Sequence, residues 1–170
     1  MDLGFKGKTV VVTGGSSGIG LAAVRLFLEE GANVAFCARG AERLEAAKAG
    51  LVADFGEERL FAEAVSVLDE DAFNGFAQRV LDRFGGVDAL INNAGQGRVS
   101  TFASTTDDAW REELELKYFS QIYPVRAFRA ALEKSGQGAI VAVNSLLAFQ
   151  PEPHMVCTAS ARAGIQNLLK

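Results

Sequence analysis

Short apolar runs alternate along the chain with longer segments in which apolar residues recur every three or four positions. The apolar runs predict buried strands at residues 8–12, 33–37, 59–67, 87–91 and 139–143. The helical spacing predicts helices at residues 21–29, 41–53, 69–84, from about 106 to beyond 128, and at about 155–169. Strands that alternate with helices pair into parallel sheets through right-handed crossovers. The pattern therefore predicts an α/β fold built on a parallel sheet.

Two residues refine the predicted helices. Pro124 lies inside the longest helical segment, and a residue without an N–H predicts a kink or a local break there. Asp69 stands just before another helical segment and predicts its N-cap. With 170 residues, of which 49% are apolar, the chain has the size of one domain with a sizeable core.

Composition and charge argue against several classes of protein. The net charge is −4 and no long basic run occurs, which argues against nucleic-acid binding. No apolar stretch approaches the roughly 18 residues of a membrane span, and residues 1–6 lack the pattern of a signal peptide. Cys37 and Cys157 are far apart, so neither a disulfide framework nor a metal site is expected. We therefore expect a cytoplasmic protein without nucleic-acid or membrane partners.

A glycine-rich turn, Thr13–Gly20, connects the first predicted strand to the first predicted helix. Gly14 allows the chain to reverse tightly, Gly18 allows backbone to approach a diphosphate, and Gly20 allows the helix to pack closely on the strand. The free N–H groups and the positive dipole end of the helix then face the anion. The residues expected to hold the phosphates of a nucleotide cofactor are Gly14, Ser16, Ser17, Gly18, Ile19 and Gly20.

The end of the second strand indicates which cofactor binds. Dinucleotide folds that take NAD place an acidic residue about 20 residues beyond the glycines, where it binds the ribose 2′-hydroxyl. This chain has Ala38 and Arg39 there. A guanidinium can pair with a 2′-phosphate, and Ser16 and Ser17 can add hydroxyl donors. We therefore expect NADP(H), with NAD(H) the less favoured cofactor; the simpler interpretation of Arg39 is a surface arginine that opens a loop.

Three motifs in register carry a family resemblance. Thr13-Gly14-x-x-x-Gly18-x-Gly20 is followed by Asn92-Asn93-Ala94-Gly95 after the fourth strand and by Ser145 after the fifth. From about residue 5 to residue 170, the chain resembles the short-chain dehydrogenase/reductase family. The resemblance implies a Rossmann-like doubly wound parallel sheet with helices on both faces. It also implies a nicotinamide cofactor and hydride transfer between this cofactor and a small carbonyl or alcohol substrate.

The resemblance implies further contacts with the cofactor. Asn93, Ala94 and Gly95 would line the adenosine ribose and the approach to the nicotinamide. Val67 would pack on the adenine, while Ser66 stands where the family usually has an aspartate that holds the adenine amino group. The asparagine amides can equally cap a turn, and both roles can hold at once.

The catalytic positions depart from the family pattern. The family uses a serine, a tyrosine thirteen residues later, a lysine four residues beyond it, and an asparagine in the preceding long helix. Here the serine is Ser145, but Thr158, Arg162 and Lys117 occupy the other three positions. An aliphatic hydroxyl is far less acidic than a phenol, so Thr158 is a poor acid or base. Arg162 keeps a cation that can bind ribose, but it cannot move a proton.

Lys117 is the candidate that could replace the tyrosine. An ammonium near Arg162 in a partly desolvated cleft would have its pKa lowered by burial and by the neighbouring charge, which suits an acid or base. The simpler interpretation is a lysine that reaches solvent or a backbone carbonyl. His154 could donate a proton near neutral pH, although an exposed loop histidine is the commoner case. Tyr118 and Tyr123 are expected on other faces of the helix.

Three classes of function fit these residues. The first is an NADP(H)-dependent oxidoreductase with a reworked acid/base site that comprises Ser145, Lys117, Thr158 and Arg162. The second is a nucleotide-binding protein without turnover, which acts as a sensor or regulatory subunit. The third is a lyase- or epimerase-like enzyme. All three changed positions remain polar, which favours a reworked site over simple decay, and we therefore favour the first class.

Two further expectations come from the resemblance. The family continues beyond the length of this chain, so residues 1–170 are expected to form a single NAD(P)-binding Rossmann domain that is truncated at its C-terminal end. In the family the two helices that here begin near Thr106 and Met155 pack against their copies in a partner. Here these helices carry surplus apolar residues such as Phe119, Ile122 and Phe128, which predicts a homodimer or homotetramer.

Overall fold

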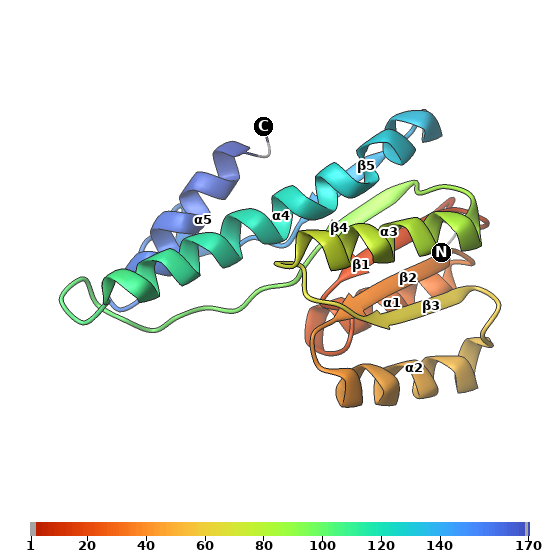
Figure 1. The fold of residues 1–170 in the computed structure, drawn as a ribbon, viewed down its shortest axis with the longest axis horizontal. Helices are drawn as coiled ribbons and strands as arrows, with labels where there is room; N and C mark the ends of the chain where they lie inside the picture. Colours follow the sequence, from red (N-terminus) through yellow and green to blue (C-terminus); the bar gives the residue numbers. More distant parts are fainter. Residues whose placement is uncertain (1–2, 169) are drawn as a thin grey trace.

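The computed structural model describes residues 3–168 and 170, and its five parallel strands form one sheet with helices on both faces (Figure 1). The elements along the chain are β1 (Thr9–Thr13), α1 (Gly18–Glu29), β2 (Asn33–Ala38), α2 (Ala41–Phe55), β3 (Leu60–Ala64), α3 (Glu70–Phe84), β4 (Ala89–Asn92), α4 (Asp107–Ser135), β5 (Ala139–Ala142), the short 3₁₀ helix η1 (Leu146–Ala148) and α5 (Val156–Leu168). Across the sheet the order is β3-β2-β1-β4-β5. The predicted doubly wound α/β fold is confirmed. Residue 169, the end of the last predicted helix, lies outside the described residues.

β1 lies at the centre of the sheet and contributes to two apolar cores. Successive strand residues point to opposite faces, so alternate valines enter different layers. Val11 packs on one face with Phe76 of α3 and Phe128 of α4. Val10 and Val12 pack on the other face, in the core that contains the buried residues of α1 and α2. β1 therefore has all five residues buried, and its near-continuous apolar sequence is what a strand covered on both faces requires.

Several boundaries differ from the sequence-based predictions. The strand predicted at 59–67 ends at Ala64. Its neighbour β2 ends at Ala38, and the carbonyl of Ala38 accepts the last hydrogen bond between the two segments, from Val65 N at 3.0 Å. Beyond this point no neighbouring strand remains to pair with. The predicted N-cap is confirmed, since the Asp69 carboxylate accepts a 3.0 Å hydrogen bond from Ala72 N.

The long helix α4 is not interrupted at Pro124. It continues from Asp107 to Ser135, so the predicted local break is wrong. A proline removes one hydrogen bond from the helix, but Pro124 is itself buried, and α4 packs on α3, β4 and α5. Tertiary contacts on several sides therefore hold the helix through this residue. Of the helices in the described part of the chain, none combines the length and apolar character that crossing a membrane requires.

The order of the strands creates a switch point between β1 and β4. From β1 the chain builds outward through β2 and β3, and then it returns to the other side of β1 to form β4 and β5 (Figure 1). The crossovers on the two sides therefore diverge, which leaves a crevice at the carboxyl ends of β1 and β4. The glycine-rich turn follows β1, and Asn93–Gly95 follow β4, so both predicted motifs reach this crevice.

A pair of glycine substitutions tests how closely α1 is seated on the turn. A Cβ atom on Gly20 would overlap the carbonyl oxygen of Gly14 and the side-chain amide of Asn93, whereas a Cβ on Gly50 in α2 would meet nothing within 4 Å. We expect Gly20→Ala to lower the free energy of unfolding by about 1–3 kcal/mol through overpacking. Gly50→Ala should raise it by about 0.5–1 kcal/mol, because alanine loses less backbone entropy on folding. Urea unfolding measures both, and equal stability of Gly20→Ala and the parent would contradict this packing.

Candidate functional site

The glycine-rich turn forms one wall of a pocket at the switch point. Gly14 has a φ of +70°, and the amides of Gly14 and Gly15 donate to Cys37 O at 2.9 and 3.1 Å, which ties the turn to the end of β2. A Cβ on Gly18 would meet nothing within 4 Å, so the turn is open there. No side chain caps the N-terminus of α1 at Ser17, although side chains cap both α3 and α4. The start of α1 is therefore available for an anion.

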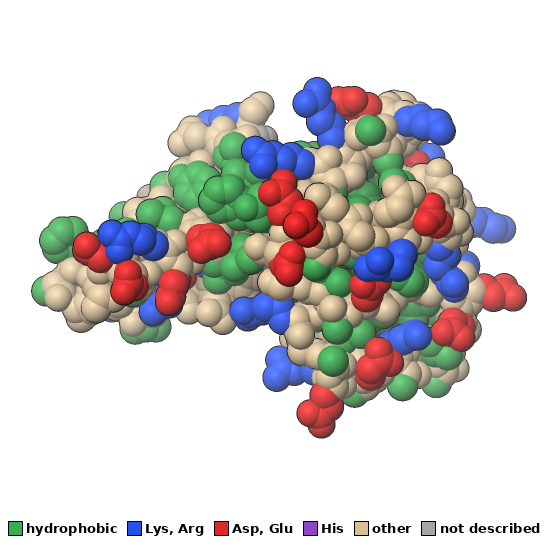
Figure 2. All heavy atoms as spheres, in the orientation of Figure 1, with side chains coloured by type: hydrophobic (Ala, Val, Ile, Leu, Met, Phe, Trp, Pro, Cys, Tyr) green, Lys and Arg blue, Asp and Glu red, His purple; other side chains and the backbone are tan. Residues whose placement is uncertain are grey.

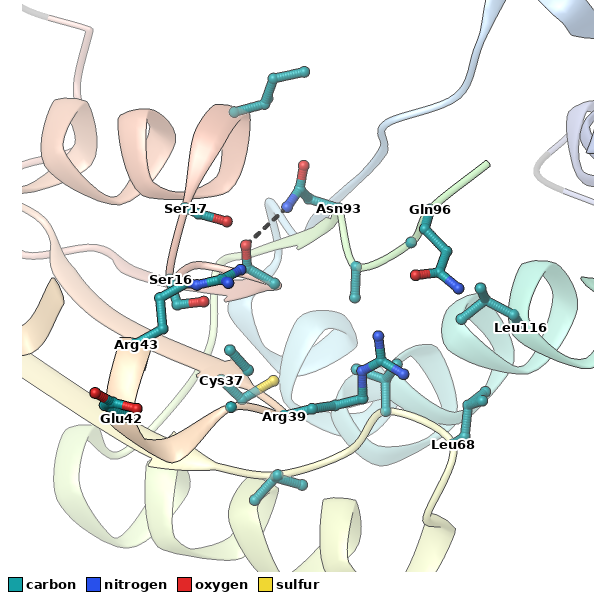
Figure 3. Close-up of a pocket in the computed structure, with 18 residues that line it drawn as sticks. Ser16, Ser17, Cys37, Arg39, Glu42, Arg43, Leu68, Asn93, Gln96 and Leu116 are labelled. Atoms are coloured by element: carbon teal, nitrogen blue, oxygen red, sulfur yellow. Dashed lines mark hydrogen bonds between the residues drawn. The ribbon is translucent and has the colours of Figure 1, made fainter. Parts of the chain in front are cut away.

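Thr13 and Asn93 join the ends of β1 and β4. Thr13 Oγ1 accepts hydrogen bonds from the backbone amides of Asn93 and Ala94, each at 3.0 Å. The side-chain amide of Asn93 donates to the carbonyl of Thr13 at 3.0 Å. It also donates to the carbonyl of Gly14 at 3.1 Å (Figure 3). Asn93 thus holds the turn with its side chain, the alternative role considered for it. These bonds also position Ala94 and Gly95 in the pocket wall.

The pocket has a volume of about 790 Å³, a size suited to a dinucleotide fragment. Most of the predicted cofactor residues line it, namely Gly14, Ser16, Ser17, Ile19, Arg39, Val67, Asn93, Ala94 and Gly95. Gly18 and Gly20 lie next to these residues, in the first turn of α1. Cys37 also reaches the pocket, and burial raises the pKa of its thiol to about 12, so this group remains neutral.

The pocket includes a second arginine that the sequence analysis missed. Arg43, in the first turn of α2, lines the pocket with Arg39, and both residues are exposed. In Figure 3, Ser16 and Arg43 lie toward one end of the pocket and Gln96 toward the other. Two guanidinium groups beside serine hydroxyls form a suitable donor set for a phosphate. The two arginines are four residues apart, but Arg39 follows β2 and Arg43 lies in α2, so the spacing alone did not place them on one surface.

Lys117 lies in a buried network next to the pocket. Its Nζ donates to the carbonyl of Gln96, a residue of the pocket wall, and lies 3.0 Å from Glu113 Oε1. Thr158 Oγ1 donates to the same carboxylate at 2.5 Å and accepts from Arg98 N at 2.9 Å. The side chains of Lys117 and Glu113 are only 4% and 2% exposed. The structure therefore brings Lys117 and Thr158 together through Glu113.

The environment of Lys117 lowers its pKa. Burial is the largest cause, and the nearby positive charge of Arg162 acts in the same direction. Glu113 opposes both, through its hydrogen bond and its negative charge. Lys117 thus bonds to a backbone carbonyl, which was the simpler interpretation of this residue from the sequence. Its pKa is lowered all the same. Glu113 was not among the residues predicted from the sequence, although it lies four residues before Lys117, a spacing that makes two side chains neighbours on one helix.

Arg162 lies at the carboxyl end of β5. One of its terminal nitrogens donates to Val143 O at 2.8 Å and to Asn144 Oδ1 at 3.5 Å, while its Nε is buried without a partner among the described residues. Burial lowers the pKa of Arg162, and Glu113 acts in the opposite direction. A guanidinium nevertheless remains charged at neutral pH. Its contacts in the structure are with the protein, so a bond to ribose stays a prediction.

Ser145 lies in a separate hollow of about 570 Å³, which His154 also lines. Its hydroxyl accepts a hydrogen bond from Leu147 N at 3.2 Å at the start of η1. His154 Nε2 is 3.0 Å from a carboxylate oxygen of Glu152, and both of these side chains are more than half exposed. No hydrogen bond or ion pair among the described residues joins Ser145 to Lys117. The four predicted catalytic residues therefore do not form one bonded cluster.

Comparison with known proteins agrees with this geometry. The sequence profile of the short chain dehydrogenase family matches residues 8–170. The NADPH-bound structure of a short chain oxidoreductase from Pseudomonas aeruginosa PAO1, described as containing an atypical catalytic center, is 60% identical with a TM-score of 0.93. The match covers 95% of this chain and 63% of that one.

Two further relatives share the fold or sequence along nearly the whole chain. L-sorbose reductase from Gluconobacter frateurii, complexed with NADPH and L-sorbose, is 34% identical with a TM-score of 0.92; the match covers 99% of this chain and 64% of that one. A 3-oxoacyl-[acyl-carrier-protein] reductase from Chlamydia pneumoniae is 34% identical over 165 residues, 97% of this chain and 66% of the relative. The chain spans about two thirds of the length of these relatives. From its motifs, sheet topology and profile match, the chain belongs to the short-chain dehydrogenase family.

Proposed function

We propose that the protein is an NADP(H)-dependent oxidoreductase that exchanges hydride between the nicotinamide and a small carbonyl or alcohol substrate. The observation that carries this proposal is the buried cation of Lys117, hydrogen-bonded to the carbonyl of Gln96 in the wall of the cofactor pocket. NADPH bound to the relatives from Pseudomonas aeruginosa and Gluconobacter frateurii supports the choice of cofactor.

The residues of the pocket fit a dinucleotide with a 2′-phosphate. The uncapped start of α1 offers backbone N–H groups to the diphosphate. Arg39, Arg43, Ser16 and Ser17 supply charge and hydroxyl donors for the additional phosphate. The carboxylate of Glu42 also lines the pocket, so the arginines must outweigh one opposing charge. When bound, the nicotinamide supplies or accepts the hydride.

Lys117 is the residue proposed to exchange the proton. An ammonium has three N–H donors, and the structure engages two of them, with Glu113 and Gln96. We assign the third to a substrate oxygen bound at the pocket wall, and a lowered pKa makes the proton easier to release. Thr158 is unsuited to this role in the observed arrangement, because both acceptors of its only hydroxyl hydrogen lie within the protein, Glu113 at 2.5 Å and the carbonyl of Arg98 at 3.4 Å.

Ser145 and Arg162 have supporting roles in this proposal. The Ser145 oxygen accepts from Leu147 N, which leaves its own hydrogen free to polarise a carbonyl. Arg162 keeps a positive charge near Lys117 and lowers the pKa of that lysine. A second candidate function is nucleotide binding without turnover. The absence of a bond from Ser145 to Lys117 among the described residues favours this alternative, and it predicts that no carbonyl compound is reduced.

The family resemblance and the surface of α4 support a homo-oligomer. Figure 2 shows apolar side chains gathered over the part of the molecule where α4 and α5 lie. Leu114 and Phe119 of α4 are 40% and 36% exposed, and Ile122 is half-buried. Phe128, which the sequence analysis counted in this surface, is fully buried against the sheet and is therefore excluded from it.

The choice of cofactor can be tested by calorimetry. The parent protein should bind NADPH more tightly than NADH. Arg39→Ala should reduce this preference by about 1–3 kcal/mol, the value of charge-assisted hydrogen bonds to a phosphate. Arg43→Ala should act in the same direction. Arg126→Ala, which removes an exposed arginine of α4 outside the pocket, is the matched control. Equal affinity of the parent for the two cofactors would refute the assignment.

The role of Lys117 can be tested by steady-state oxidation of NADPH with a panel of carbonyl compounds. Lys117→Met keeps the length of the side chain but removes the proton, so turnover should fall by about 10²–10⁴-fold while NADPH affinity stays nearly intact. Thr158→Val should cost much less. Lys134→Met, in the last turn of the same helix, is the control. If Lys117→Met leaves the turnover rate unchanged and His154→Ala abolishes it, the histidine and not the lysine exchanges the proton.

The assembly can be tested by light scattering of the protein over a range of concentrations. We expect a dimer or tetramer, and Phe119→Asp should weaken it because the substitution places a charge on the exposed apolar face of α4. Arg129→Asp, on an exposed part of the same helix, is the control for a changed charge alone. A mass equal to one chain at every concentration of the parent would argue against this face as an interface.

A further inference from the structure

Glu113 is a buried carboxylate to which neither the sequence motifs nor the family pattern assigns a role. It lies one helical turn before Lys117 on α4, and only 2% of its side chain is exposed. Its Oε1 receives two contacts, from Thr158 Oγ1 at 2.5 Å and from Lys117 Nζ at 3.0 Å. A buried carboxylate without partners would be strongly unfavourable, so these contacts are what allow Glu113 to remain in the interior.

The contacts of this network converge on the Glu113 carboxylate. Arg98 N donates to Thr158 Oγ1, and that hydroxyl donates to Glu113. Lys117 donates to Glu113 from the other side and to the carbonyl of Gln96. The carboxylate can only accept, so it fixes the orientation of both donors. Glu113 thereby determines where the ammonium lies relative to the pocket wall.

The charges around Lys117 come from two helices and a loop. Glu113, on α4, is the only carboxylate within hydrogen-bond distance of Lys117 Nζ among the described residues. On α5, the positive charge of Arg162 lowers the pKa of Lys117, whereas Cys157 raises this pKa by a smaller amount. Arg98, in the loop before α4, directs its side chain to Glu112 at 2.6 Å. Glu113 is therefore the group that counteracts both burial and Arg162.

We propose that Glu113 is a positioning residue that holds Lys117 at the pocket wall and keeps it protonated over the pH range in which the enzyme reduces its substrate. This inference deepens the proposed function and rests on the role that it gives to Lys117. The sign of the effect follows from the charges. Without the carboxylate, burial and Arg162 act on Lys117 unopposed, so the lysine should lose its proton at a lower pH.

The direct test is an NMR titration of the whole protein labelled with ¹³C at the lysine Cε. Loss of a resonance in Lys117→Met assigns the Lys117 signal. In the parent, Lys117 should titrate at a lower pH than the exposed lysines. Glu113→Gln keeps the shape of the side chain and removes its charge, and it should lower the Lys117 midpoint further, by about 1–3 pH units. Glu115→Gln removes the same charge from the exposed face of α4 and should leave the midpoint unchanged.

Activity gives the second readout. Reduction requires the protonated lysine, so kcat/KM falls as pH rises through the pKa of Lys117. This basic limb should move to lower pH in Glu113→Gln by the same amount as the NMR midpoint, while the dissociation constant for NADPH stays within twofold of the parent. Glu113→Asp keeps the charge and should move the limb less, and it provides the test if Glu113→Gln does not fold.

The outcomes separate this inference from the proposed function. An unchanged Lys117 midpoint in Glu113→Gln, or an equal shift in Glu115→Gln, would overturn the role of Glu113. If Glu113→Gln does not fold, a Glu113→Asp midpoint below that of the parent supports the role, because the shorter side chain holds the carboxylate farther from the ammonium, and a midpoint equal to that of the parent overturns it. A parent that oxidises no NADPH would instead refute the proposed function, and the NMR titration would still decide whether Glu113 keeps Lys117 protonated.

Discussion

The hydrogen bonds between the ends of β1 and β4 are the constraint on which the site depends. Thr13 and Asn93 are eighty residues apart, and four hydrogen bonds of 3.0–3.1 Å join these two residues and their neighbours. Because the sheet reverses its order between β1 and β4, these bonds close the base of the crevice at the switch point. The glycine turn and the wall formed by Ala94 and Gly95 therefore have fixed relative positions before any ligand arrives.

The loop after β4 connects this crevice to the other parts of the candidate site. The carbonyl of Gln96 accepts from Lys117, and the amide of Arg98 donates to Thr158. Two residues later, Ser100 N donates to His154 O at 2.9 Å, in the segment that borders the hollow of Ser145. One short segment thus contacts the cofactor pocket, the buried network and the second hollow. A ligand that shifts this loop would therefore change the contacts at the cofactor pocket, in the buried network and at the second hollow.

The buried network combines opposite electrostatic effects on one lysine. Burial and Arg162 favour the neutral amine, whereas Glu113 favours the ammonium. A lysine whose pKa is lowered in this way releases its proton more readily than an exposed lysine, which is a property required of an acid/base. The family pattern relies on a phenol and a lysine for this purpose. Here the same positions hold Thr158 and Arg162, and the proposed function assigns the proton exchange to Lys117 on α4, the helix that packs against α5.

The sequence by itself determined the elements that depend on local periodicity and backbone chemistry. The alternation of apolar runs and helical spacing predicted the sheet, the glycines predicted the turn, and Asp69 was identified as a cap because capping involves residues only three apart. Nine of the residues that line the pocket were also predicted from the motifs and the strand ends, whereas Glu42, Arg43, Gln96 and Leu116 were not. Only the tertiary structure decided which side chains meet. Glu113 contacts Thr158 from 45 residues away, and Phe128 turns into the core rather than toward a partner. Such contacts depend on how α4 is rotated and docked, and the spacing of residues along one helix does not specify this.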